Sequence, residues 1–190
     1  MPELTEIRWH GRAGQGVVTA SDMLAETALE EGKYFQSLPE FGAERQGAPI
    51  RAYTRISDAP LRLHCQITDP DVVVVLDASL VGVINITEGL KKDGLLIINT
   101  SMTPAEIRAK LNLANSKVYT IDATRIAMDT IGLNIPNTPI VGALVELTEV
   151  VDKETLINSV RSKMSAKFSP KVVEGNLNAL ERSFTEVVSE

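Results

Sequence analysis

The stretch from Glu6 to Ala20 reads EIRWHGRAGQGVVTA and predicts a strand, a tight glycine turn and a helix, in that order. Glycine supplies backbone conformations that a side chain forbids, and a turn this tight requires them. It also leaves amide N–H groups bare near the positive end of the following helix, where anions bind. The turn is therefore a candidate site for a phosphate or carboxylate, formed by Gly11, Arg12, Gly14, Gln15 and Gly16.

Two common phosphate-binding motifs do not fit this turn. A P-loop requires a lysine directly after its last glycine, but Val17 follows Gly16. A dinucleotide fingerprint requires a third glycine where Thr19 stands, and a carboxylate near residues 34–37, which read YFQS. One alternative stays open, namely that the glycines merely allow the strand and the helix to cross closely.

The composition is that of an ordinary globular protein, and we expect residues 1–190 to form a single domain. A net charge of −6 and an aromatic content of only 4% argue against a surface for nucleic acid or anionic membranes. The lone cysteine, Cys65, excludes an internal disulfide framework and an iron–sulfur cluster bound by this chain alone. No apolar run reaches membrane-spanning length and no signal peptide is recognisable, so a cytoplasmic location is expected.

Strand and helix patterns alternate along most of the chain. Continuous apolar runs predict strands buried on both faces of a sheet at residues 71–77, 95–98 and 118–121. Helices are expected to separate them, at residues 79–92, 104–114 and 124–133. The other expected elements are strands at 6–10, 33–38, 50–56 and 61–67, and helices at 16–31, 139–150, 153–166 and 170–188.

These elements predict an α/β fold with three layers around a mostly parallel, Rossmann-like sheet. The alternating runs at 50–56 and 61–67 are expected to form an antiparallel pair, and the C-terminal third is expected to be helical. Helix starts carry recognisable caps. Thr103-Pro104-x-Glu106 supplies a capping box. The other expected N-caps are Thr138, Asp152 and Ser169.

Two further segments are expected to join the glycine turn at the carboxyl ends of the parallel strands, where ligands of open α/β sheets gather. One is a loop at 39–49 that is dense in charge and glycine, and the other is the helix start near Asn137, whose free amides can face an anion. The candidate residues in these segments are Glu44, Arg45, Gln46, Gly47, Asn137 and Thr138. The alternative for Glu44 and Arg45 is an exposed ion pair that binds nothing.

No catalytic residue is predicted. His10 and His64 are the only histidines, and each lies in or beside an expected strand without a nucleophile motif. We expect His10 to be packed and hydrogen-bonded, and Cys65 to be a small core residue because it alternates with apolar positions. Metal-ligand spacings are also lacking, so the chain by itself has no recognisable set of catalytic groups.

Two long motifs lie in the first third of the chain: RxHGxxGQG at residues 8–16 and EFGAERQGAPIR at residues 40–51. Shorter stretches follow, at Arg55-Ile56-Ser57, Asp69-Pro70-Asp71, Asp122-Ala123-Thr124, Asn137-Thr138 and Gly142-Ala143. Together they resemble the gamma subunit of 2-oxoacid:ferredoxin oxidoreductases over residues 6–185, and the pyruvate enzyme most. One departure is Gln46, where the family often has a second arginine, so a charge-based role at that position is in doubt.

The resemblance implies a subunit of a complex that converts a 2-oxoacid and coenzyme A to acyl-CoA, carbon dioxide and reduced ferredoxin. It implies alpha, beta and delta-type partner subunits that carry thiamine diphosphate, magnesium and iron–sulfur clusters. This chain would help assembly and bind coenzyme A at a shared site, with the amides at 14–16 and the Arg45 guanidinium on its phosphates. The isolated chain can form a homodimer through surfaces meant for its partners. Two alternatives stay open: a free-standing nucleotide-binding oxidoreductase, and an assembly module whose glycine turn is empty.

Overall fold

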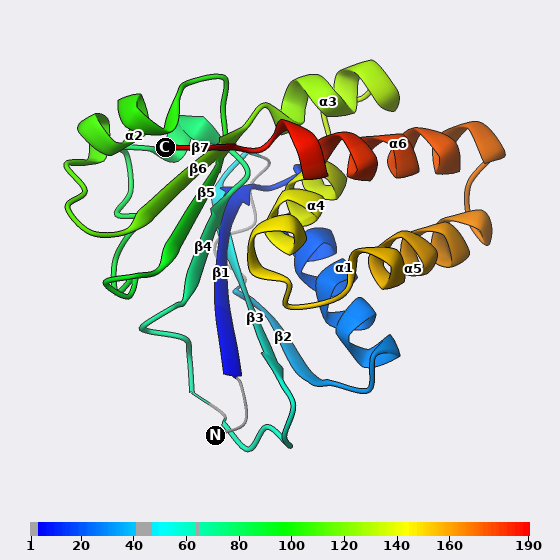
Figure 1. Cartoon of the computed structure of the whole chain (residues 1–190), viewed down its shortest axis with the longest axis horizontal. Coiled ribbons are helices and arrows are strands. Elements are labelled where there is room, and N and C mark those ends of the chain that lie inside the picture. The colour runs from blue at the N-terminus through cyan, green and yellow to red at the C-terminus, as the bar shows by residue number, and fades with distance from the viewer. Residues whose placement is uncertain (1–3, 41–46, 64) are drawn as a thin grey trace.

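The computed structural model describes residues 4–40, 47–63 and 65–190. Within this part, seven strands form one sheet in the order β2-β3-β1-β4-β5-β6-β7 (Figure 1). The strands are β1 Leu4–Arg12, β2 Tyr34–Glu40, β3 Pro49–Ser57, β4 Val72–Val75, β5 Leu95–Asn99, β6 Lys117–Ile121 and β7 Val188–Ser189. Neighbours among β1, β4, β5 and β6 are parallel, whereas β3 is antiparallel to β1 and β2, and β7 to β6. The expected α/β fold is confirmed, with a sheet that is parallel in its centre and antiparallel towards both edges.

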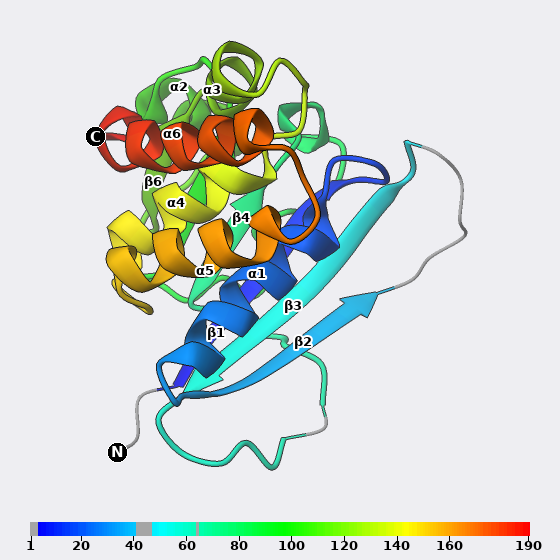
Figure 2. The same cartoon turned by 90° about the vertical axis from the view of Figure 1, so that its right-hand side faces the viewer.

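Most of the helices cover one face of this sheet (Figures 1 and 2). The helices are α1 Val17–Glu30, α2 Pro104–Leu111, α3 Ala123–Thr130, α4 Asn137–Thr148, α5 Lys153–Ser165 and α6 Pro170–Glu186, with a 3-10 turn, η1, at Ala78–Leu80. On one side, α4 packs against α1 and α6, and α3 and α5 pack against α6. On the other side, α2 and the segment that contains η1 cover β4, β5 and β6. The fold therefore has three layers, and its C-terminal third is helical.

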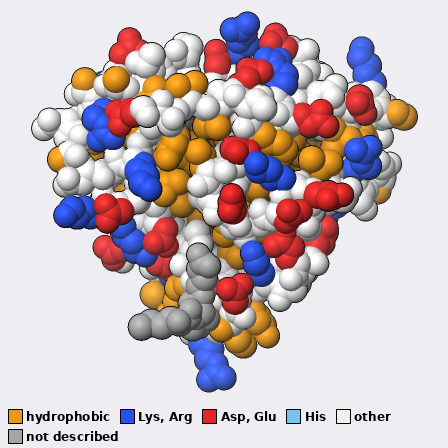
Figure 3. Space-filling model, viewed as in Figure 1, with side chains coloured by type: hydrophobic (Ala, Val, Ile, Leu, Met, Phe, Trp, Pro, Cys, Tyr) orange, Lys and Arg blue, Asp and Glu red, His pale blue; other side chains and the backbone are white. Residues whose placement is uncertain are grey.

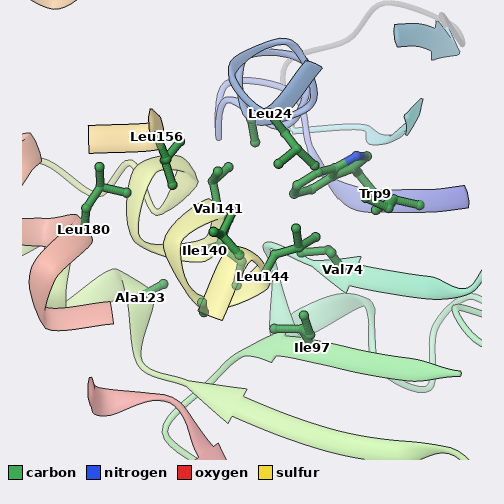
Figure 4. Close-up of a cluster of buried hydrophobic side chains, with 14 of the residues drawn as sticks. Trp9, Leu24, Val74, Ile97, Ala123, Ile140, Val141, Leu144, Leu156 and Leu180 are labelled. Atoms are coloured by element: carbon green, nitrogen blue, oxygen red, sulfur yellow. The ribbon is translucent and has the colours of Figure 1, made fainter. Parts of the chain in front are cut away.

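Two hydrophobic cores lie on opposite faces of the sheet, because successive side chains of a strand point to opposite sides. Val74 joins Trp9 and Ile140 in the core beneath the helices (Figure 4). Its neighbour Val73 packs with Ile107 of α2 in the second core. Both valines are fully buried, which explains why the sequence of this strand is continuously apolar instead of alternating.

Local capping signals fix several helix starts. The Thr103 hydroxyl accepts the Glu106 backbone N–H at 3.3 Å, and the Glu106 carboxylate accepts the Thr103 N–H at 2.7 Å. The Asp152 carboxylate accepts the Thr155 N–H at 3.0 Å where α5 begins. The predicted capping box and the predicted Asp152 cap are confirmed. The helix expected to end at 188 stops at Glu186, since the chain then turns to pair as β7 with β6.

The strand expected at 61–67 is wrong, and so is its pairing with 50–56. Residues 61–63 and 65–67 contain no strand, and Cys65 is exposed instead of buried. The reason is that β3 already pairs with β1 along one edge and with β2 along the other. No edge of β3 is left for a third partner, so alternation alone does not produce a strand here. The antiparallel hairpin of the fold is β2–β3.

The helix expected at 79–92 is also wrong, because only η1 is helical there. Gly82 and Gly89 have left-handed backbone conformations, with φ of 84° and 67°, which interrupt a right-handed helix. Arg8 of β1 supplies the missing partners, since its Nη2 donates to the carbonyl oxygens of Ile86 (3.1 Å) and Glu88. A buried side chain distant in sequence thus replaces the hydrogen bonds that a helix would make.

Charged side chains of both signs are interspersed over the face drawn in Figure 3, and hydrophobic side chains lie between them. No single sign of charge covers this face, so it does not present the continuous basic surface that a nucleic-acid backbone requires. Among the described helices, none is long and apolar enough to cross a membrane.

Candidate functional site

The carboxyl ends of the parallel strands β1, β4, β5 and β6 meet at the upper edge of the sheet in Figure 1, and α1 begins there. Strand β1 extends through Gly11 and Arg12, so the turn itself covers residues 13–16. A Cβ added to Gly11 would lie 2.5 Å from Val17 Cγ2, so this glycine permits the close crossing of β1 and α1. The packing explanation therefore accounts for Gly11.

Gly14 and Gly16 have a different role, because their backbones are left-handed, with φ of 99° and 79°. Gly16 is the N-cap of α1, no side chain caps the helix, and its first turn holds no acidic residue. A helix start of this kind leaves backbone N–H groups without intrahelical partners. Gly14 is exposed and Gly16 is half-buried, so these amides lie close to solvent. The turn has the geometry and the partial positive charge of an anion site.

Arg12 is held at this turn by several contacts. Its Nε donates to Ser79 Oγ at 3.1 Å and lies 3.4 Å from Asp77 Oδ2, and its Nη1 donates to the carbonyl of Gly47 at 2.9 Å. Gln15 braces the turn, since its Oε1 accepts the Arg12 backbone N–H at 2.8 Å and its Nε2 donates to Asp77 at 2.7 Å. With 31% of its side chain exposed, Arg12 still presents guanidinium N–H groups to solvent.

Asp77, which directly follows the Val run, is a residue that the sequence did not assign to the site. Burial tends to raise the pKa of its carboxyl group, but hydrogen bonds from Ser79 and Gln15 and the charge of Arg12 outweigh that effect and lower the pKa. Asp77 is therefore ionised at neutral pH and fixes both Gln15 and Arg12. Its position after a buried strand was the available signal, because ligands and their supporting groups gather at such strand ends.

The start of α4 reaches the turn through Asn137. A Cβ on Gly16 would lie only 2.8 Å from Asn137 Nδ2, so the two segments are in direct contact. Helix α4 begins at Asn137, two residues earlier than expected, and Thr138 is inside the helix and not its cap. Thr138 is fully buried and donates to Asn176 Oδ1 at 2.8 Å, so its side chain joins α4 to α6 and does not face the turn.

The second predicted segment is described only in part. Glu44, Arg45 and Gln46 lie outside the described residues. Gly47 lies at the turn, where its carbonyl accepts the Arg12 guanidinium, and the next carbonyl, that of Ala48, accepts the Ala13 N–H at 3.0 Å. The predicted meeting of this loop with the glycine turn therefore holds for its C-terminal end.

Asn99, at the carboxyl end of β5, is like Asp77 a residue near the site that the sequence analysis did not identify. Its Nδ2 donates to the Leu76 carbonyl at 2.8 Å, and its Oδ1 accepts the Thr124 N–H at 3.0 Å. It thereby ties β4, β5 and α3 together beneath the site. Among the described residues, no group of three His, Cys, Asp or Glu side chains is placed to hold a metal ion.

Comparison with known proteins assigns the chain to a family. The pyruvate ferredoxin/flavodoxin oxidoreductase family matches residues 6–186. Pyruvate synthase subunit PorC of Thermotoga maritima is 48% identical over 182 residues, which are 96% of this chain and 94% of that protein. The common gamma subunit of the pyruvate and ketoisovalerate oxidoreductases of Pyrococcus abyssi is 45% identical over 95% of this chain and 97% of its own length.

Solved structures agree with this assignment. The crystal structure of the Thermotoga maritima subunit PORC has a TM-score of 0.88 at 45% identity, covering 99% of both chains. The 2-oxoglutarate:ferredoxin oxidoreductase of Magnetococcus marinus, solved with 2-oxoglutarate, coenzyme A and succinyl-CoA bound, has a TM-score of 0.78 over 95% of this chain and 30% of that chain. At 22% identity the latter shows a shared fold only. The chain therefore belongs to the pyruvate ferredoxin/flavodoxin oxidoreductase family, as a gamma-type subunit, which its two N-terminal motifs predicted.

Proposed function

We propose that this subunit binds the phosphate groups of coenzyme A at the glycine turn, within a 2-oxoacid:ferredoxin oxidoreductase that acts on pyruvate. The observation that carries the proposal is the uncapped start of α1, which follows the exposed Gly14, together with the Arg12 guanidinium at the same turn. Backbone N–H groups and a guanidinium are together the donors that a pyrophosphate or a 3′-phosphate requires. The names of the relatives support pyruvate as a 2-oxoacid substrate, since some are pyruvate synthase subunits and others are gamma subunits common to the pyruvate and ketoisovalerate oxidoreductases.

Arg12 suits this role because its position is fixed while part of its fork is free. The Nε–H donates to Ser79, and one N–H of Nη1 donates to the carbonyl of Gly47. A guanidinium carries five N–H donors, so three have no hydrogen-bond partner among the described residues and can donate to phosphate oxygens. Asp77 holds the arginine in place without neutralising it fully, because the 3.4 Å ion pair is partly exposed to water. An anchored arginine loses less conformational freedom when it binds a ligand.

We further propose that residues 1–190 act as one domain and leave the carbon chemistry to partner subunits. The continuous core that joins β1, β4 and α4 to α6 supports a single domain. A sequence with one cysteine supports the placing of iron–sulfur clusters on alpha, beta or delta-type partners, along with thiamine diphosphate and magnesium. Ferredoxin would then be reduced through the complex. The proposed ligand-side residues of this chain are Arg12, Gly14, Gln15, Gly16, Gly47 and Asn137, together with Glu44, Arg45 and Gln46, whereas Gly11 serves the packing of β1 on α1.

Hydrogen exchange of the assembled complex, followed by mass spectrometry, tests this proposal, because the peptides of this chain can be followed separately from those of its partners. Exposed amides exchange quickly, and a bound acceptor slows them. We expect coenzyme A and adenosine 3′,5′-bisphosphate to slow exchange in the peptide that spans residues 13–20, and pantetheine, which has no phosphate, to leave it unchanged.

Each alternative predicts a different pattern in the same experiment. If saturating coenzyme A leaves residues 13–20 unchanged, the turn is empty and the subunit serves assembly alone. If NAD or NADP protects this peptide and coenzyme A does not, the chain is a nucleotide-binding oxidoreductase subunit instead. The peptide that spans residues 90–94 is the internal control, because it leads into the amino end of β5, at the opposite edge of the sheet from the turn.

A further inference from the structure

A polar hollow lies beside β1, on the face of the sheet opposite to α1. It has a volume of about 280 Å³ and is lined by His10, Pro49, Arg51, Ile84, Asn85 and Glu88. Trp9 and Gly11 face the helix layer, so the alternation of the strand directs His10 to the other side. The hollow is therefore distinct from the start of α1, and the proposed coenzyme A site does not use it.

His10 faces this hollow with an unsatisfied donor. The ring is only 1% exposed, and its Nε2 accepts a hydrogen bond from Arg8 Nε at 3.1 Å. Burial, followed by the charges of Arg8 and Arg51, lowers the pKa of His10 to about 3, so the ring is neutral at pH 7. A neutral imidazole that accepts at Nε2 carries its proton on Nδ1. In the part of the chain that the structure describes, this buried Nδ1 has no hydrogen-bond partner.

The charges around the ring favour an anion. Arg8 is 3% exposed, and its described partners are His10 and two backbone carbonyls, none of which is negatively charged. Arg51, opposite His10 in the register of β1 and β3, adds a second cation at the rim, where Glu40 partly compensates it. Glu88 at the other rim opposes an anion, but it is exposed to water, which screens its charge.

We propose that this hollow binds a carboxylate group, which accepts the Nδ1–H of His10 and pairs with Arg51. The oxygens of a carboxylate provide the acceptor that the Nδ1–H of His10 lacks among the described residues. The negative charge of the carboxylate compensates the buried Arg8. The carboxylate belongs either to a free small acid or to an Asp or Glu side chain of a partner subunit, since both present the same group.

Nitrogen NMR of the full chain, labelled with ¹⁵N-histidine, tests this proposal directly. The sequence has only two histidines, so His64→Gln assigns the His10 signals. We expect the Nδ1-protonated form without ligand, and a saturable shift of that nitrogen on titration with acetate at constant ionic strength. Acetamide, which has the same shape but no charge, should produce no saturable shift.

Two rim variants give the proposal its matched controls. Arg51→Gln should weaken acetate binding about two- to fivefold, and Glu88→Gln should strengthen it by a similar factor, because each changes one solvent-screened charge.

A spectrum of the assembled complex distinguishes the two sources of the carboxylate. If the carboxylate belongs to a partner side chain, His10 is already hydrogen-bonded in the complex and acetate does not shift its nitrogen signals. If the carboxylate belongs to a free acid, acetate still shifts these signals in the complex. An unprotonated Nδ1, an equal response to acetamide, or no response in the wild type and in Glu88→Gln would overturn the proposal.

Discussion

Replacing Arg12 with glutamine is expected to weaken coenzyme A binding by the assembled complex roughly 10- to 100-fold. A hydrogen bond between a guanidinium and a phosphate contributes about 1.5–3 kcal/mol, and Arg12 is the described cation anchored beside the uncapped start of α1. Its anchors, Ser79 and Gly47, would lose their partner as well. Equilibrium titration of coenzyme A into wild-type and variant complexes measures the change.

Two further variants make the Arg12 result interpretable. Arg12→Lys keeps the charge but loses the planar fork, so its affinity should lie between those of the wild type and Arg12→Gln. Arg161→Gln removes the same charge from an exposed position on α5 and should leave the affinity unchanged. Equal affinities of the wild type and Arg12→Gln, with both complexes intact, would remove Arg12 from the site.

The Gly16→Ala variant should lose about 2–5 kcal/mol of unfolding free energy. The left-handed backbone at this position, with a φ of 79°, costs a side chain about 1–2 kcal/mol. The added Cβ would also lie 2.8 Å from Asn137 Nδ2 and 3.1 Å from its Cβ, which costs about 1–3 kcal/mol more of packing strain. Chemical denaturation of the full chain, followed by circular dichroism, measures the loss.

Gly32→Ala is the control for this second contribution. Gly32 follows α1 with a nearly identical φ of 75°, but a Cβ there meets nothing within 4 Å. It should therefore lose only the backbone contribution, about 1–2 kcal/mol. If the two variants lose the same stability, the close contact between the glycine turn and α4 does not matter energetically, and the turn is free to move relative to Asn137.

Most of the sheet was predictable from local sequence. The Val run of β4 is apolar at every position because both of its faces are covered, and that pattern is visible without a structure. The capping box at Thr103 and the Asp152 cap depend on residues three positions apart, so they too could be read directly. Elements that are determined by their own neighbours in sequence are those that a sequence predicts well.

The errors have a different origin, because long-range contacts decide those elements. Residues 61–67 alternate like a strand, but β1 and β2 occupy both edges of β3. Residues 79–92 resemble a helix, but the Arg8 side chain takes the carbonyls of Ile86 and Glu88. Each outcome depends on at least one contact between residues more than 30 positions apart, β1 with β3 in the first case and Arg8 with Ile86 in the second, which a local pattern does not contain.

The candidate site divides in the same way. The glycines at 14 and 16 were predictable, since a left-handed turn before a helix requires them. Asp77 was not, although its carboxylate fixes Gln15 and Arg12, because only the fold brings the ends of β1 and β4 together. Thr138 was a sound expectation as a cap, but packing against Asn176 of α6 determines its orientation.

A structure of the assembled complex with coenzyme A bound tests the phosphate-binding role most directly. We predict phosphate oxygens within about 2.7–3.2 Å of the backbone nitrogens at the start of α1, and an Arg12 guanidinium nitrogen at a similar distance. Coenzyme A that contacts partner subunits alone, with the glycine turn more than a hydrogen bond away from every phosphate, would contradict that role.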